Sequence, residues 1–251
     1  MLAVEGLSKS FGGVAAMANV TLDFAAGSLT AIIGPNGAGK TTFFNLISGA
    51  MRPDGGSVKL AGEDIGGLSP TRIVRRGVVR AFQIASIFPS LTVEAALTAT
   101  AQAHMGQAER LTRRFPLPEC RDRARAVMQM LGLTDKAAVP SSSLSHGDQK
   151  LLDIGLALML EPRVLLLDEP TAGMGPEERW QMIGKVQELW KRQKMTLVFI
   201  EHDMDIVFKI AQSIRVLCYG RVLAQGTPGE IRGHPEVIAA YLGTSHEIRG
   251  S

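Results

Sequence analysis

A glycine-rich stretch near the N-terminus, Gly34–Thr42, limits the fold of this chain more than any other segment. Its residues, GPNGAGKTT, fit the pattern G-x-x-x-x-G-K-[ST]. Residues 29–33 before it are apolar or β-branched, which predicts a buried strand. Residues 43–47 after it carry apolar side chains at helical spacing, and Gly49 is placed to end that helix. A strand, a glycine-rich turn and a helix in this order predict a loop that binds a nucleoside triphosphate.

The residue types in this stretch suit the binding of a polyphosphate. Glycine at positions 34, 37 and 39 permits positive φ and adds no Cβ, so backbone N–H groups can converge on the phosphates. The N-terminus of the following helix adds partial positive charge. We expect Lys40 to reach the outer phosphates and the Thr41 hydroxyl to coordinate Mg²⁺. A turn with an incidental lysine is the alternative, but every fixed position of the pattern is filled. The predicted nucleotide-binding residues are Gly34, Pro35, Asn36, Gly37, Ala38, Gly39, Lys40, Thr41 and Thr42.

Composition narrows the class of protein. Apolar residues make up 45% and charged residues 20% of the 251 residues, which is typical of a soluble globular protein. The net charge of +3 is too small to indicate a nucleic-acid partner by itself. Two cysteines give no disulfide framework, and we expect reduced thiols in a cytosolic protein. No apolar run approaches the roughly 18–20 residues that cross a bilayer, and no signal peptide is apparent. If the protein acts at a membrane, we therefore expect partner proteins to hold it there.

Strands and helices are predicted to alternate along most of the chain. Residues 2–24 alternate between apolar and polar positions around Gly12-Gly13, which indicates antiparallel strands. Phe11, just before this turn, either stacks on a nucleobase or packs in the core. Alternating strands and helices imply a largely parallel sheet that binds ligands at the carboxyl ends of its strands. The further predicted strands are 57–61, 78–82, 164–167, 196–200, 214–218 and 221–224, and the helices are 145–160, 176–192 and 203–211.

Residues 84–143 differ from the rest, with two predicted helices at 92–104 and 119–131. Between positions 72 and 125 there are ten arginines, no lysine and four acidic residues. Such charge either solvates helix faces or forms a surface for acidic lipid or an acidic partner loop. Because almost no aromatic residues lie among the arginines, nucleic acid is the less favoured partner.

Two carboxylates follow the apolar strand 164–167, and they indicate the reaction. Beside a phosphate loop, Asp168 is placed to hold the Mg²⁺ shell and Glu169 to polarise the attacking water as general base. An acidic turn closed by Pro170 is the alternative. His202 follows strand 196–200 in the same way, and we expect it to contact the terminal phosphate or the attacking water rather than to be purely structural.

The order of these motifs resembles the ATP-binding cassette (ABC) ATPases along essentially the whole chain. Gln83 stands at the start of the helical insert, and Leu144–Gln149 (LSHGDQ) is similar to the cassette signature. The resemblance implies an α/β P-loop NTPase fold with a mostly parallel core sheet, an N-terminal antiparallel β subdomain and an inserted helical subdomain. We therefore expect one ATPase domain, in which residues 1–83 and 144–251 form the nucleotide-binding core and residues 84–143 the helical insert.

The resemblance also implies roles for individual residues. Phe11 would stack on adenine, and Gln83 would link the Mg²⁺ site to the helical subdomain and act with Glu169 and His202 in catalysis. Ser145 and Gly147 would contact the γ-phosphate of ATP bound to a second subunit. From spacing alone, Ser145 is simply the N-cap of a helix, and it can serve both roles. The cofactors implied are ATP and Mg²⁺.

The signature and its surroundings depart from the common family pattern. The signature carries His146 and Asp148, and the turn Ala172–Gly175 has no aspartate, which puts an aspartate-mediated contact between subunits in doubt. These variants and the tail 240–243 (AYLG) are similar to the ATPase subunits of importers for branched-chain amino acids and related amides or urea. An ATPase for lipopolysaccharide export and a soluble P-loop ATPase unconnected to transport are the alternatives.

Membership of that subgroup implies a set of partners and a location. The chain would form a homodimer or pair with a paralogous ATPase, and it would bind two integral-membrane permease subunits. A periplasmic solute-binding protein would deliver the solute. No nucleic-acid partner is expected. The chain would lie peripherally on the cytoplasmic face of the inner membrane.

Overall fold

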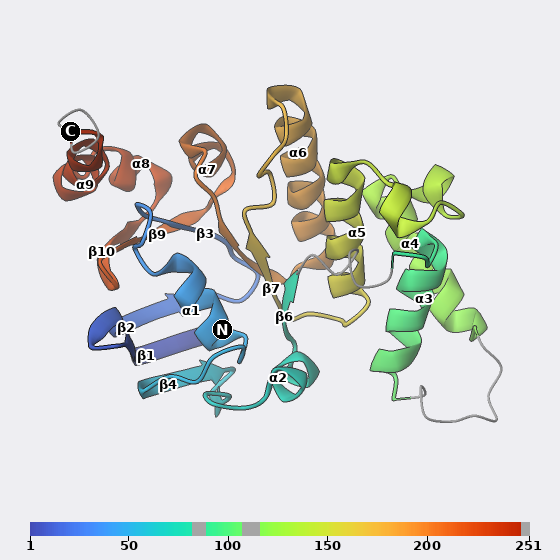
Figure 1. The fold of residues 1–251 in the computed structure, drawn as a ribbon, viewed down its shortest axis with the longest axis horizontal. Coiled ribbons are helices and arrows are strands. Elements are labelled where there is room, and N and C mark those ends of the chain that lie inside the picture. The colour runs from blue at the N-terminus through green and yellow to red at the C-terminus, as the bar shows by residue number, and fades with distance from the viewer. Residues whose placement is uncertain (82–88, 107–115, 247–251) are drawn as a thin grey trace.

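The computed structural model of the protein describes residues 1–81, 89–106 and 116–246, which form two β-sheets surrounded by helices (Figure 1). The first sheet is antiparallel and has the order β2-β1-β4-β5. Its strands are β1 (Leu2–Phe11), β2 (Val14–Phe24), β4 (Gly55–Leu60) and β5 (Glu63–Asp64). The antiparallel hairpin predicted around Gly12-Gly13 is confirmed, since β1 and β2 pair on either side of it.

The second sheet has the order β10-β9-β3-β8-β7-β6, and all its pairs are parallel except β10 with β9. Its strands are β3 (Leu29–Ile33), β6 (Val78–Ala81), β7 (Val164–Asp168), β8 (Thr196–Ile200), β9 (Ser213–Cys218) and β10 (Arg221–Gly226). Strand β3 lies between β9 and β8, and β7 follows next to β8. Because parallel strands end at the same edge, the segments after β3, β7 and β8 meet there.

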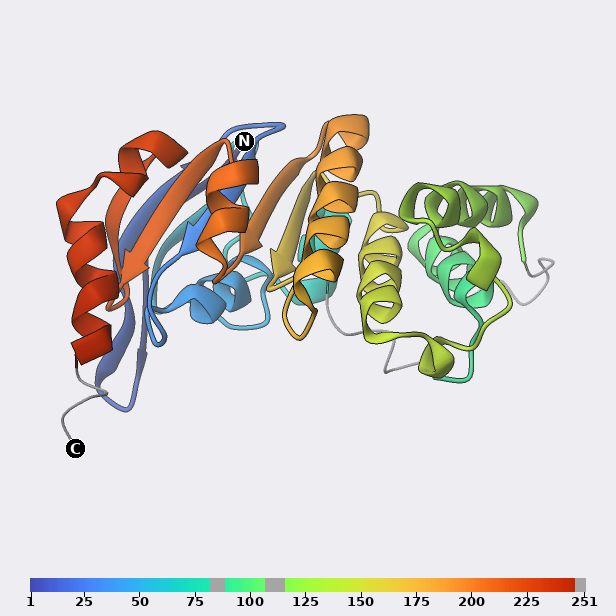
Figure 2. The same ribbon diagram turned by 90° about the horizontal axis from the view of Figure 1, so that it is seen from above.

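Helices cover both faces of the second sheet. Helix α1 (Lys40–Ile47) lies between the two sheets, where Phe43 and Phe44 are fully buried among apolar side chains of both. The opposite face packs against α5 (His146–Leu158), α6 (Pro176–Gln193) and α7 (Met204–Ile210). Figure 2 shows this row of helices from above. Helices α2 (Pro70–Arg76), α8 (Pro228–Arg232) and α9 (Pro235–His246) lie at the edges of the molecule.

Helices α3 (Val93–His104) and α4 (Pro118–Leu131) form an arm at one end of the elongated molecule (Figure 1). Both pack on α5 through apolar side chains such as Leu97, Val127 and Leu131. Short 3-10 turns at Thr134–Lys136 and Ser141–Ser143 lead from α4 back to α5. The two ends of this region are hydrogen-bonded: Val93 N donates to Val139 O at 3.1 Å, and Ser141 N donates to Leu91 O at 2.9 Å.

The predicted fold class is confirmed, with an antiparallel N-terminal sheet, a mostly parallel core sheet and a helical arm. Each predicted helix and strand is present within a few residues, and α1 begins three residues earlier than predicted, at Lys40. Strand β5 and helix α2 were not predicted. The boundaries of the insert at residues 84 and 143 remain a prediction, since residues 82–88 lie outside the described part of the chain.

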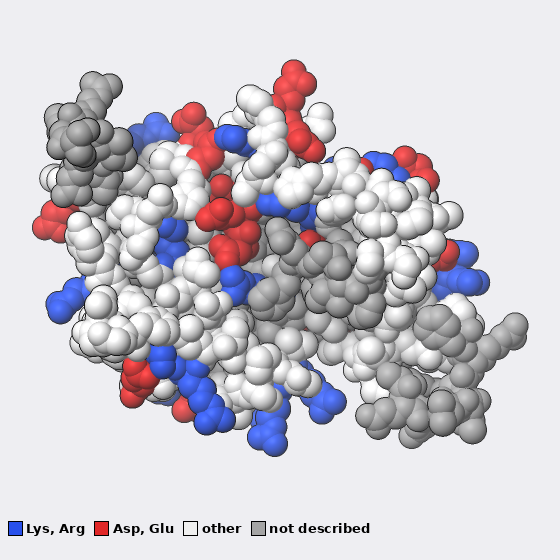
Figure 3. Space-filling view, viewed as in Figure 1, with Lys and Arg blue, Asp and Glu red and all other residues white. Residues whose placement is uncertain are grey.

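Within the basic segment 72–125, the arginines of α4 and those of α2 have different environments. On α4, Arg121 and Arg125 both form ion pairs with Glu94 of α3. These side chains keep the surface of the arm polar and link its two helices. On α2, the three arginines are exposed at helical spacing. Figure 3 shows basic side chains along the edge of the molecule where α2 lies. The described arginines therefore fit the first interpretation on α4, whereas α2 leaves both open. The arginines of α2 are Arg72, Arg75 and Arg76.

Candidate nucleotide-binding and hydrolysis site

The segment between β3 and α1 has the backbone that a phosphate loop requires. Gly34, Gly37 and Gly39 have φ values of 153°, 77° and 98°, which confirms the prediction of positive φ. A Cβ on Gly34 would lie 2.1 Å from the Leu217 carbonyl oxygen, so the loop passes too close to β9 for a side chain. The first turn of α1 has no side-chain cap. Its N–H groups are therefore available to an anion.

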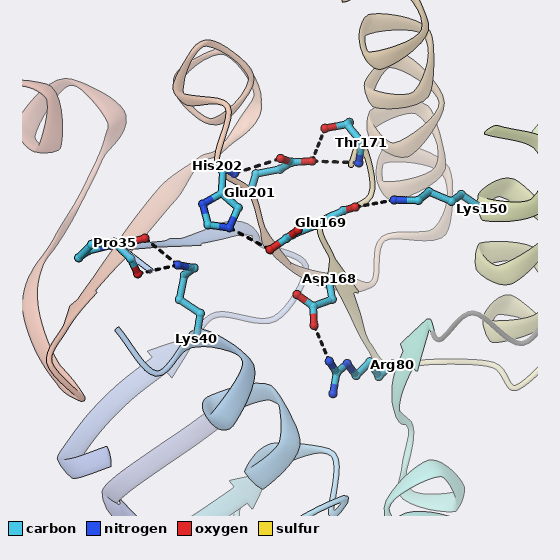
Figure 4. Close-up of polar contacts among 10 residues, drawn as sticks. Pro35, Lys40, Arg80, Lys150, Asp168, Glu169, Thr171, Glu201 and His202 are labelled. Carbon is cyan, nitrogen blue, oxygen red and sulfur yellow. Dashed lines mark hydrogen bonds and ion pairs between the residues drawn. The ribbon is translucent and has the colours of Figure 1, made fainter. Parts of the chain in front are cut away.

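Lys40 is only 7% exposed and points back along the loop. Its Nζ donates to the carbonyl oxygens of Gly34 at 2.7 Å and Pro35 at 3.0 Å (Figure 4). Burial lowers the pKa of Lys40, and the nearby carboxylates of Glu169 and Asp168 oppose this shift. Lys40 therefore lies close enough to Asp168 and Glu169, the two predicted acids, for their charges to interact. Among the remaining loop residues, Asn36 and Thr41 are exposed, Pro35 and Thr42 are half-buried, and Ala38 is buried.

Asp168 ends strand β7 and is paired with a cation that sequence analysis missed. Its Oδ2 accepts a hydrogen bond from Arg80 Nη2, and Arg80 Nη1 donates to Asn45 Oδ1 at 2.6 Å. Arg80 lies on β6, which pairs directly with β7, and its guanidinium lies 5.7 Å from the Phe44 ring centroid. This pairing compensates the cost of placing a carboxylate where only 21% of its side chain is exposed.

Glu169, the next residue, faces His202 across the ends of β7 and β8. Glu169 Oε1 lies 2.9 Å from His202 Nε2, and the two side chains are 42% and 46% exposed. The distance is that of a hydrogen bond, and both groups remain open to solvent. Figure 4 shows the pair on the side of the strand ends that faces Lys40. Acidic side chains also gather near the middle of this face in Figure 3. The arrangement can bind a water molecule and remove its proton.

Glu201, at the end of β8, is a buried carboxylate that joins the two strand ends. It is 4% exposed, and its Oε1 accepts hydrogen bonds from Thr171 N at 3.0 Å and Thr171 Oγ1 at 2.5 Å. Its Oε2 accepts from His202 N at 3.1 Å. The sequence shows Glu201 beside His202, but nothing in the pattern indicates its partner thirty residues away. Glu201 fixes the segment after Glu169 to the segment that carries His202.

The signature-like segment begins α5, away from the phosphate loop. Ser145 is the N-cap, as predicted: its Oγ accepts from Asp148 N at 3.2 Å and donates to Asp148 Oδ2 at 2.7 Å. Lys136 Nζ also donates to Asp148 Oδ2, at 2.5 Å. Gly147 is buried, and a Cβ there would lie 2.3 Å from Glu178 Oε1. Helix α5 packs on one face of the sheet and α1 on the other.

Two further predicted site residues remain to be placed. Phe11 is the last residue of β1 and is 46% exposed, with Lys9 Nζ at 5.8 Å from its ring centroid. It is therefore not a core residue, and its ring is open to a ligand. Gln83 lies outside the described residues.

The described residues fit a magnesium ion that arrives with its nucleotide. No group of three or more His, Cys, Asp or Glu side chains that could hold a metal occurs in residues 1–81, 89–106 and 116–246. Mg²⁺ bound to nucleotide phosphates needs only one or two protein oxygens. The exposed Thr41 hydroxyl and the half-buried Asp168 carboxylate can supply them.

Comparison with known proteins identifies the family. A family model described as ABC transporter matches residues 17–172. The chain belongs to the ABC transporter family. A second model, described as a branched-chain amino acid ATP-binding cassette transporter, matches residues 221–247, which include β10, α8 and α9.

Relatives and solved structures agree with this assignment over nearly the full length of the cassette. LivG of Salmonella typhimurium, a high-affinity branched-chain amino acid transport ATP-binding protein, is 40% identical, and the match covers 97% of this chain and 98% of LivG. BraF of Pseudomonas aeruginosa, with the same description, is 38% identical over 97% and 98%. The ADP conformation of an ATP-binding cassette from an ABC transporter superposes with a TM-score of 0.86 at 30% identity, covering 97% of this chain and 98% of that one.

The cassette is therefore an ATPase whose hydrolysis of ATP is coupled to transport by an ABC importer. As an ATP-binding subunit it works with membrane-embedded permease subunits. Among the residues that the structure describes, no helix is both long and apolar enough to cross a membrane.

Proposed function

We propose that the cassette hydrolyses ATP through the Glu169–His202 pair and thereby drives uptake of branched-chain amino acids or related small amides and carboxylates. The observation that carries the catalytic part is the 2.9 Å contact between Glu169 Oε1 and His202 Nε2, next to the phosphate loop. Glu169 accepts the proton of the attacking water, and His202 holds Glu169 and the water in line with the terminal phosphate.

The phosphate loop supplies binding and charge neutralisation. Backbone N–H groups of residues 34–42 and the N-terminus of α1 hold the phosphates, and Lys40 turns from the loop carbonyls toward the outer phosphates. Thr41, Asp168 and, from the family resemblance, Gln83 would hold Mg²⁺, which neutralises the charge that develops on the phosphates. The exposed ring of Phe11 stacks on adenine.

The second half of each site comes from another cassette. In one chain, α1 and the start of α5 lie on opposite faces of the sheet, which supports a dimer in which Ser145 and Gly147 of one subunit contact ATP held by the other. The second cassette is either identical or a paralogue. Closing of the dimer on ATP is transmitted through the α3–α4 arm to two permease subunits on the cytoplasmic face of the inner membrane.

The solute is inferred from the relatives and from the C-terminal segment. LivG and BraF are both described as branched-chain amino acid transport proteins, and the second family model covers the segment that carries α9. These observations favour amino-acid import over lipopolysaccharide export. A periplasmic binding protein completes the proposed importer.

Uptake of radiolabelled leucine, isoleucine and valine by a strain lacking this chain tests the assignment of the solute. We expect uptake to fall at low external concentration and to return with the parental gene but not with Glu169→Gln. Three other solutes serve for comparison: urea, glutamine and one simple amide. Unchanged uptake together with a block in lipopolysaccharide export would overturn the importer proposal.

A further inference from the structure

Helix α5 contacts the catalytic segment directly through Lys150. The ammonium group of Lys150 donates a hydrogen bond to the main-chain carbonyl oxygen of Glu169 at 2.8 Å (Figure 4). The side chain is half-buried in a narrow cleft that Asp168 and Pro170 also line. Lys150 thus reaches from the signature helix to the peptide group of the proposed general base.

The backbone of Glu169 needs such support. Its φ of +48° lies in the left-handed region, which a residue with a side chain adopts at a cost of about 1–3 kcal/mol. Three hydrogen bonds hold the backbone of the residue in this conformation. Its N–H donates to Ile200 O at 3.0 Å, and its carbonyl oxygen accepts from Ala172 N at 3.1 Å and from Lys150 Nζ. The bond to Ile200 comes from the neighbouring strand and the bond from Ala172 closes a turn, whereas the bond from Lys150 comes from a helix outside the sheet.

Two opposed effects act on the charge of Lys150. Burial lowers the pKa of Lys150 below its ordinary value, and the nearby carboxylates of Glu201, Glu169, Asp153 and Asp168 oppose this shift without reversing it. The ammonium group therefore serves both as a hydrogen-bond donor and as a counter-charge for the carboxylates of the site. An apolar side chain of similar length, such as that of methionine, would supply neither.

A second contact lies one helical turn earlier on the same face of α5. His146 Nε2 is 3.3 Å from the carbonyl oxygen of Ala172. Residues four apart on a helix are neighbours, so His146 and Lys150 together hold the segment from Glu169 to Ala172 against α5. His146 is one of the departures from the usual signature, so this contact depends on the variant residue.

We propose that Lys150 is a positioning residue that holds Glu169 in its left-handed conformation and ties the base to the signature helix. This inference rests on the proposed function, in which Glu169 is the base and Ser145 contacts ATP bound to the partner subunit. Ser145 is the N-cap of α5, so a displacement of this helix reaches the Glu169 peptide through the Lys150 side chain. The position of Glu169, the base of the chain's own site, thereby depends on the nucleotide that the partner subunit holds.

Steady-state ATP hydrolysis by Lys150→Met tests the inference. We expect kcat to fall about 10- to 100-fold, the range for a misplaced catalytic group, while KM for ATP stays within about threefold because the phosphate loop is intact. Lys150→Arg retains a charged donor and should recover most of the rate. Lys191→Met, at an exposed position of α6, is the control for loss of a positive charge and should match the parental protein.

The double variant Glu169→Gln/Lys150→Met separates positioning from general damage. If Lys150 acts only through the base, the double variant hydrolyses ATP as slowly as Glu169→Gln alone. A parental kcat in Lys150→Met, or a further loss in the double variant, would overturn the inference. A parental rate in Glu169→Gln would instead reject the assigned base, so the two failures are distinguishable. Thermal unfolding of each variant identifies any that are misfolded.

Discussion

At the scale of single residues, Lys40 and Glu169 separate nucleotide binding from hydrolysis. Lys40→Ala removes the buried cation of the phosphate loop, so we expect ATP binding to be lost. Glu169→Gln keeps the shape of the side chain but cannot accept the proton of water. It should bind ATP and hydrolyse it about 10²–10⁴-fold more slowly. Equilibrium binding of a fluorescent ATP analogue and phosphate release measure the two effects. Lys59→Ala, at a surface pair with Glu5, is the matched control.

Hydrolysis by Glu169→Gln at nearly the parental rate would show that another group activates the water. Tight ATP binding by Lys40→Ala would contradict the role given to that lysine.

The sequence was sufficient for some of these residues and insufficient for others. The phosphate loop was predictable because its pattern dictates the backbone: glycine is needed at position 34, where a Cβ would meet Leu217 O. Arg80 and Lys150 were missed because their partners, Asp168 and the carbonyl of Glu169, are distant along the chain. Contacts of this kind follow from strand order and helix placement, which one sequence does not contain.

At the scale of elements, the junction of β7 and β8 depends on the buried carboxylate of Glu201. Glu201→Ala leaves the N–H and hydroxyl of Thr171 without this acceptor in a buried setting. We expect the free energy of unfolding to fall by about 2–3 kcal/mol, because each buried polar group left unsatisfied costs about 1–3 kcal/mol. Urea denaturation measures this change. Glu188→Ala, which removes an exposed i,i+4 pair with Arg192, should cost less than about 0.5 kcal/mol. Equal losses in both variants would contradict the assigned importance of the junction.

Elements with strong apolar patterns were predictable, and weakly patterned ones were not. Strand β8 was predicted at residues 196–200, and the structure has it with the same bounds, paired with β3. Helix α2 was missed because it spans seven residues and buries only Ile73. Its start, Ser69 before Pro70, is typical of a helix N-terminus but is too short a signal to stand alone.

At the scale of the whole molecule, the proposed site is complete only when two cassettes meet. A mixture of Lys40→Ala and Ser145→Arg subunits tests this arrangement. If the site is shared between chains, one of the two sites in the mixed dimer combines an intact phosphate loop with an intact signature. We expect ATP-dependent dimers in the mixture and not with either variant alone, measured by size-exclusion chromatography with light scattering. Failure of every mixture of folded proteins would contradict a shared site.

The hydrogen bonds that join residues 91–93 to residues 139–141 make the α3–α4 arm a closed unit. The chain leaves the core and returns to it at neighbouring points, so the segment between them is held to the core mainly where α3 and α4 pack on α5. An arm of this kind can be exchanged between related proteins while the nucleotide-binding core is kept. Evolution can therefore change which permease subunits the ATPase contacts while the site that hydrolyses ATP stays the same.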